Sequence, residues 1–166
     1  MPVAYVPVVI TDQNIAVDDP RSPDVAALLA RHLRFSLAQT PAEYSFALGQ
    51  DGLADDAVTL FSFREHGTLL GIGAIKQLGP CDAEIKSMHT AEAARGRGIG
   101  RALLTHLVEV ARGRGCRTVS LETGTTEAFA SARALYASTG FVPCGPFADY
   151  RPSEHNLFMT MDLDPV

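Results

Sequence analysis

The chain has 166 residues, of which 46% are hydrophobic and 20% are charged, and its formal net charge is −5. This length and composition are those of one globular domain, so we expect residues 1–166 to form a single domain and exclude a disordered or fibrous chain. The acidic balance argues against nucleic acid or an anionic membrane surface as a partner. No apolar run approaches the roughly 18 residues of a membrane span and the first residues lack a signal-peptide pattern, so we expect a cytoplasmic protein.

The three cysteines, Cys81, Cys116 and Cys144, do not form a recognisable metal or disulfide motif. They are odd in number and too far apart for a CxxC pair. We therefore expect reduced, partly buried thiols and no metal site.

The first half of the chain predicts a strand, a helix and an antiparallel meander. Residues 3–10 are β-branched and apolar around Pro7, which is typical of an edge strand. Ser22 and Pro23 predict the start of a helix whose apolar face runs from Val25 to Leu37. After an irregular stretch at 49–57, three strand-like runs at 58–63, 69–77 and 83–90 follow each other through short turns.

The second half predicts two helices that alternate with strands. Apolar residues at helical spacing run from Leu103 to Ala111, and Gly113 and Gly115 end that helix. A strand at 118–122 and a third helix that ends at Gly140 come next, and strands at 141–142 and 157–163 complete the order. This order predicts an α/β, mixed α+β, chain in which helices cover both faces of a mixed sheet.

The segment from Ala94 to Ala102 predicts a phosphate-binding loop. Its glycines let the backbone approach an anion, and the free amides and dipole of the following helix favour negative charge there. Arg95, Arg97 and Arg101 add donors that suit phosphate oxygens. The glycine spacing is G-x-G-x-G without a lysine, which disfavours both a dinucleotide-binding fingerprint and a P-loop.

Within this loop, Arg95, Gly98 and Gly100 match the pattern R-x-x-G-x-G/A, and the segment resembles the acetyl-coenzyme A pyrophosphate loop of the GNAT family of N-acetyltransferases. Residues 84–90 resemble that family's fourth strand, and 134–136 with 140–141 resemble its Leu-Tyr…Gly-Phe motif. Segments 121–124, 141–147 and 149–151 are similar to a YsnE-like subgroup of small bacterial acetyltransferases. The resemblance implies the GNAT fold, with a mostly antiparallel mixed sheet of about six to seven strands.

The resemblance also implies acetyl-CoA as the acetyl donor, without a metal. Pantetheine would lie along residues 85–90, with the amide of Met88 facing the acetyl oxygen and Thr90 making the next contacts. Many members carry an asparagine where this chain has Phe129, which weakens that one cofactor contact. The pyrophosphate would lie on the loop formed by Arg95, Gly96, Arg97, Gly98, Ile99, Gly100 and Arg101.

Two residues are the leading catalytic candidates. Tyr136 matches the tyrosine that in many members protonates the leaving thiolate, although it also fits a core aromatic on its helix. Glu84 is the first candidate for the general base, acting directly or through water, and Glu122 is a second carboxylate. The even spacing of Glu84, Lys86 and Met88 predicts that they share one face of the strand. The alternative for Glu84 is an ordinary strand carboxylate paired with Lys86.

We expect an acetyl-CoA-dependent N-acetyltransferase in which the amine of a small molecule attacks the thioester directly in a ternary complex. The alternatives are a non-catalytic acyl-CoA-binding regulatory module and a protein or peptide N-acetyltransferase. Members of the family often pair as homodimers, so a homodimer is one assembly that the resemblance implies. His89, next to Met88, is expected on the opposite face of the strand and has no assigned role. The fold implies an acceptor cleft lined by Arg34, Glu43, Tyr150 and Arg151, with Tyr44 and His155 beside them.

Overall fold

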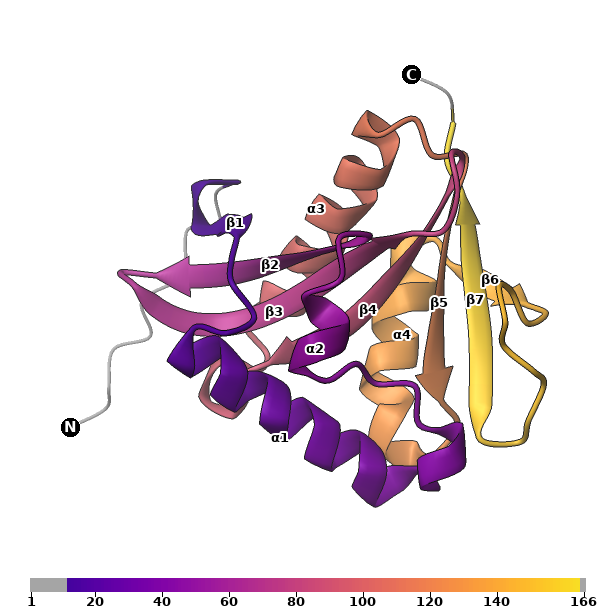
Figure 1. The fold of residues 1–166 in the computed structure, drawn as a ribbon, viewed down its shortest axis with the longest axis horizontal. Coiled ribbons are helices and arrows are strands. Elements are labelled where there is room, and N and C mark those ends of the chain that lie inside the picture. The colour runs from indigo at the N-terminus through magenta and orange to yellow at the C-terminus, as the bar shows by residue number, and fades with distance from the viewer. Residues whose placement is uncertain (1–11, 165–166) are drawn as a thin grey trace.

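A computed structural model of the protein describes residues 12–164, and the strand expected at 3–10 lies outside this range. The described strands form one seven-stranded sheet in the order β1-β2-β3-β4-β5-β7-β6 (Figure 1). All neighbouring strands pair antiparallel except β4 and β5, which are parallel. The strands are β1 (Ile15–Val17), β2 (Val58–Glu65), β3 (Thr68–Gln77), β4 (Asp82–Thr90), β5 (Thr118–Gly124), β6 (Val142–Cys144) and β7 (Asn156–Asp162).

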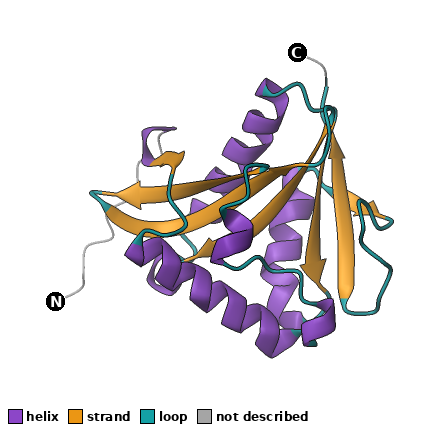
Figure 2. Ribbon diagram, viewed as in Figure 1, coloured by secondary structure: helices purple, strands orange, loops and turns teal. Residues whose placement is uncertain are grey.

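Helices cover both faces of this sheet (Figure 2), so the predicted mixed architecture and antiparallel meander are confirmed. One expectation was wrong, because the stretch at 49–57 contains the short helix α2, whose Leu53 is buried. No described helix is long and apolar enough to cross a membrane. The helices are α1 (Pro23–Gln39), α2 (Gln50–Leu53), α3 (Ile99–Gly113) and α4 (Ala130–Thr139), with single 3-10 turns at Asp12–Asn14, Ala42–Tyr44, Glu92–Ala94 and Glu127–Phe129.

Each face of the sheet has its own hydrophobic core. Val25, Leu28 and Leu29 of α1 pack on the face that Ile72 and Ala74 of β3 present. On the other face lie α3 and α4, whose buried residues join the larger core. The predicted apolar face of α3 is confirmed, because its helical repeat is fully buried at Leu103, Leu104, Leu107, Val108 and Ala111.

The two central strands separate part of the way along the sheet. β4 and β5 pair only between Asp82–Ile85 and Thr118–Leu121. Beyond these pairs β4 continues with β3 alone and β5 continues with β7 alone, and the two strands visibly diverge in Figure 1. The facing edges of residues 86–90 and 122–124 therefore have backbone groups that no neighbouring strand pairs, and they border an opening through the sheet.

A β-bulge in β4 changes which side chains face each helix layer. Lys86 lies opposite Ala74 while His89 lies opposite Ile72, so one extra residue is inserted, and Ser87 has a φ of +56°. An extra residue reverses the alternation of side chains beyond it. Lys86 and His89 consequently share the α1 face, and the sulfur of Met88 lies on the α3 face. The prediction that Met88 shares a face with Glu84 and Lys86 was wrong, and the prediction that His89 opposes Met88 is confirmed.

Candidate active site

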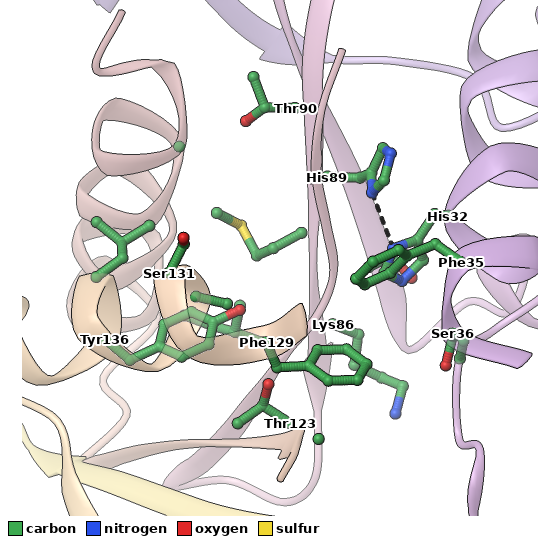
Figure 3. Close-up of a pocket in the computed structure, with 18 of the residues that line it drawn as sticks. His32, Phe35, Ser36, Lys86, His89, Thr90, Thr123, Phe129, Ser131 and Tyr136 are labelled. Carbon is green, nitrogen blue, oxygen red and sulfur yellow. Dashed lines mark hydrogen bonds between the residues drawn. The ribbon is translucent and has the colours of Figure 1, made fainter. Parts of the chain in front are cut away.

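A cavity of about 690 Å³ occupies the opening between β4 and β5. It extends through the sheet, because α1 lines it on one face and α4 lines it on the other (Figure 3). The cavity includes most of the predicted cofactor-binding and catalytic residues, namely Glu84, Met88, Thr90, Arg95, Gly96, Gly98, Ile99, Gly100, Arg101 and Tyr136.

The predicted phosphate-binding loop lies at one end of the cavity. Gly96 and Gly98 have φ values of +76° and +80°, a region that side chains of L-residues rarely adopt, and Gly98 is the N-cap of α3. The first intrahelical bond is donated by Ala102 to the Gly98 carbonyl. The amides of residues 99–101 therefore have no acceptor within the helix and are available to an anion.

The three arginines of this loop point in different directions. Arg95 is exposed and lines the cavity. Arg101 also lines it, and its guanidinium donates to the Ser138 hydroxyl at 2.8 Å. Arg97 does not line the cavity, because its guanidinium forms an ion pair with Glu65 at 3.0 Å. The loop therefore offers two arginine side chains to a bound anion, while Arg97 contributes its backbone alone.

Tyr136 is buried on α4, and its hydroxyl is turned toward the middle of the cavity (Figure 3). Burial raises the pKa of this phenol to about 12, and the negative charge of Glu122 adds to the effect. The hydroxyl therefore keeps its proton at neutral pH. The residue belongs to the core and to the cavity at once, since its ring also packs edge-on against Phe141.

Glu84 lies in a buried polar cluster on the α1 face. The ammonium of Lys86 is 3.1 Å from a carboxylate oxygen of Glu84, and only 3% of that side chain is exposed. Lys86 also donates to the Tyr150 hydroxyl at 2.8 Å, and this hydroxyl donates to the same Glu84 oxygen. Burial, followed by the charge of Glu84, raises the pKa of Tyr150, so the phenol stays a donor. Both partners therefore bind the same carboxylate oxygen of Glu84.

Glu122 lies across the opening on β5 and lines the cavity. Its carboxylate accepts a hydrogen bond of 2.6 Å from the Asn156 amide, which also donates to the Tyr44 carbonyl at 2.9 Å. Burial raises the pKa of Glu122, with the nearby Glu84 charge acting in the same direction. A carboxylate of raised pKa takes up a proton more readily than an ion-paired one.

Two histidines line the α1 side of the cavity in contact with each other. The Nδ1 atoms of His32 and His89 are 3.2 Å apart, and the two rings meet edge to face. Burial lowers the pKa of each to about 4, so both rings are neutral at pH 7. Among residues 12–164, no group of three or more His, Cys, Asp or Glu is arranged to hold a metal ion.

The predicted acceptor residues are not brought together. Arg34, Glu43 and Arg151 are exposed and outside the cavity lining, and Tyr150 contacts the site through Glu84, Lys86 and the ring of Phe46. Tyr44 does line the cavity, and its ring stacks with that of His155 at 4.8 Å. Any contact of Arg34, Glu43 and Arg151 with an acceptor stays a prediction.

Sequence reasoning missed the residues that α1 contributes instead. The predicted apolar face of this helix included Leu37, which is 47% exposed. The end of the helix that meets the cavity presents His32, Phe35 and Ser36, which stand at i, i+3 and i+4. This spacing was visible in the sequence, but the polar His32 and Ser36 hid it from a search for apolar repeats.

Known acetyltransferases are similar to this chain in sequence and in fold. The family described as Acetyltransferase (GNAT) family matches residues 24–141. The chain is 42% identical to the uncharacterized N-acetyltransferase YedL of Escherichia coli (strain K12), over 90% of this chain and 94% of that protein. It is 39% identical to the uncharacterized N-acetyltransferase YsnE of Bacillus subtilis (strain 168), over 90% and 99%. A GNAT family acetyltransferase from Elizabethkingia anophelis, solved with acetyl-CoA bound, has the same fold, with a TM-score of 0.65, 18% identity and coverage of 92% and 100%. The chain therefore belongs to the GNAT family of acetyltransferases.

Proposed function

We propose that this acetyl-CoA-dependent N-acetyltransferase acts on the amine of a small molecule, which attacks the thioester directly. The observation that carries the proposal is that one continuous cavity passes through the sheet between β4 and β5. Two substrates that enter from opposite faces meet in such a cavity without a covalent enzyme intermediate. The cytoplasmic location and the homodimer expected from the sequence stay predictions.

The donor set of the loop and strand fits acetyl-CoA, which supplies an activated thioester when bound. The free amides of residues 99–101, with Arg95 and Arg101, suit a pyrophosphate. The edge of residues 86–90 that faces the opening suits the amides of an extended pantetheine chain. We assign the amide of Met88 to the acetyl oxygen and Thr90 to the next contact, and Gly100 keeps the space beside the Thr90 hydroxyl open.

Tyr136 and a carboxylate would then handle the two protons. As the amine nitrogen bonds to the acetyl carbon, the carbon–sulfur bond breaks and the thiolate takes a proton from the Tyr136 hydroxyl. The attacking amine loses a proton to a carboxylate, directly or through water. Glu84 was the first candidate, but its carboxylate is already engaged by the Lys86 ammonium and the Tyr150 hydroxyl. We therefore propose Glu122 as the base and Glu84 as the residue that positions Lys86.

The experiment that tests this function is calorimetric titration with acetyl-CoA, followed by a thiol-release screen against amino acids, small amines, polyamines, aminoglycosides and peptides. Binding with thiol release that depends on a small amine supports the proposal. Binding without turnover favours the acyl-CoA-binding module, and turnover with peptides alone favours a protein acetyltransferase. Absence of binding would contradict the assignment of the loop.

A further inference from the structure

Two phenylalanines from opposite sides of the cavity meet in the part that α1 and the segment after it line with residues 32–47, which we call the acceptor end. Phe35 comes from α1, and Phe129 comes from the turn before α4. Their ring centroids are 5.2 Å apart and their planes are inclined by 66°. Both are half-buried and both line the cavity (Figure 3). Two rings at this inclination form a corner, in which a third ring can place its face on one and its edge on the other.

The ring of Phe129 is held rigidly in this corner. A Cβ atom at Gly124 would lie 2.3 Å from its ring carbons, so the ring rests directly on the backbone of β5. Arg133 fixes the turn between them, because its guanidinium donates to the carbonyls of Gly124 at 2.9 Å and Thr126 at 2.8 Å. A binding surface whose side chains are already ordered loses little conformational entropy when a ligand binds.

The wall that α1 and the segment after it contribute to the acceptor end is also uncharged. Phe35 is backed by His89, and His32 and His89 are neutral at pH 7 because burial lowers the pKa of each. The segment after α1 is fixed by a 2.8 Å hydrogen bond between the Ser36 and Ser45 hydroxyls, which places Phe46 in the cavity lining. From residue 32 to residue 47 the lining contains no acidic, lysine or arginine side chain.

The charged groups of the acceptor end lie on β4 and β5. The ammonium of Lys86 is already engaged within the protein, because it pairs with Glu84 and donates to the Tyr150 hydroxyl. Glu122, in contrast to Glu84, accepts a hydrogen bond from Asn156 and forms no ion pair with a lysine or arginine among the described residues. A polyamine would find one acidic partner for several ammonium groups, and an acceptor carboxylate would be repelled by Glu122.

From this arrangement we infer that the acceptor is a small aromatic amine: one ring that packs in the Phe35–Phe129 corner and a short chain that brings one primary amine to Glu122. This inference rests on the proposed function and names its substrate class. Phe35 and Phe129 thus determine acceptor specificity, and Gly124 is required to seat Phe129.

The test compares phenethylamine with three amines that each change one feature. Hexylamine lacks the ring, phenylalanine adds a carboxylate, and spermidine adds ammonium groups. We expect kcat/KM for phenethylamine to exceed each of the others about tenfold or more, the size of effect that a well-placed aromatic contact produces. A preference for hexylamine, phenylalanine or spermidine would overturn the inference, while acetyl-CoA binding with turnover of that other amine would leave the proposed function intact.

Substitutions of the two corner residues, Phe35 and Phe129, test the inference independently. Phe35→Leu and Phe129→Leu keep an apolar side chain and should lower kcat/KM for phenethylamine about tenfold more than for hexylamine, mainly through KM. Leu37→Ala, on the exposed side of α1, is the matched control and should change neither value. An unchanged ratio in both corner variants contradicts the inference.

A binding measurement covers the case in which turnover is absent. Calorimetric titration of phenethylamine into the protein saturated with coenzyme A should show binding that Phe35→Leu weakens. Should Phe129→Leu fail to fold by circular dichroism, Phe35→Leu alone decides. No phenethylamine binding to the folded, coenzyme A-loaded protein would overturn the inference.

Discussion

The Nδ1 atoms of His32 on α1 and His89 on β4 lie 3.2 Å apart, so one ring donates a hydrogen bond to the other, and the accepting nitrogen cannot take up a proton without losing that bond. Burial is the largest cause of the lowered pKa of both, followed for His32 by His89 and Lys86 and for His89 by Arg95 and Arg31. The pair joins the helix that lines the acceptor end to the strand that lines the cofactor end.

Because of this histidine pair, we expect the free energy of unfolding to decrease as the pH is lowered. The folded histidines have pKa values of about 4, whereas those of the unfolded chain lie near 6.5. Below about pH 6.5 the unfolded chain therefore binds more protons, and stability is lost as the pH falls toward 4. We expect the free energy of unfolding, measured by urea titration, to drop by about 3–4 kcal/mol from pH 7 to pH 5, with about half of the loss from each ring.

The double variant H32F/H89F should remove most of that pH dependence, because it removes both titrating rings. His66→Asn, at an exposed turn position, is the control and should retain it. A double variant with the same pH dependence as the wild type would show that other groups are responsible.

Glu84 and Glu122 are distinguished by their pH–rate profiles. Glu122→Gln should lower kcat by about a hundredfold and abolish the acidic limb of the profile, since it removes the group that takes the amine proton. Glu84→Gln should keep the acidic limb but lower the free energy of unfolding by about 3 kcal/mol, because it leaves the Lys86 ammonium buried without its anion. If Glu84→Gln loses the limb and Glu122→Gln keeps it, Glu84 is the base.

Tyr136→Phe tests the proton donor with almost no change in packing. The ring stays in the core, so acetyl-CoA affinity should remain within about twofold while kcat falls by about a hundredfold. Calorimetry and initial rates at saturating acetyl-CoA measure the two quantities separately. Weakened binding at unchanged kcat would instead assign Tyr136 to packing alone.

Gly96→Ala tests the conformation of the phosphate loop. A Cβ at this position meets no atom within 4 Å, but the φ of +76° strains any L-side chain by about 1 kcal/mol. We expect acetyl-CoA to bind severalfold more weakly. Gly113→Ala is the matched control, because it also meets no atom within 4 Å and has no positive φ. Equal effects of the two substitutions would contradict a role for the loop conformation.

The order of elements and the loop could be predicted from the sequence because both depend on local chemistry. The helical repeat from Leu103 to Ala111 and the turn between β2 and β3 require only neighbouring residues. The glycines at 96 and 98 indicate the backbone conformation that an anion-binding helix start needs. The family was predicted by resemblance, from the pattern of Arg95, Gly98 and Gly100 together with the segments 84–90 and 134–141.

The character of the acceptor end was decided by the tertiary structure. The bulge at Ser87 turns Met88 away from the face of Lys86, and strict alternation along β4 cannot predict a bulge. Arg97 is held away from the cavity by its ion pair with Glu65, which lies 32 positions earlier in the chain. Phe35 and Phe129 meet only because α1 and α4 lie on opposite faces of a sheet that opens between them. Contacts of this kind depend on how distant segments pack, and local periodicity carries no information about that packing.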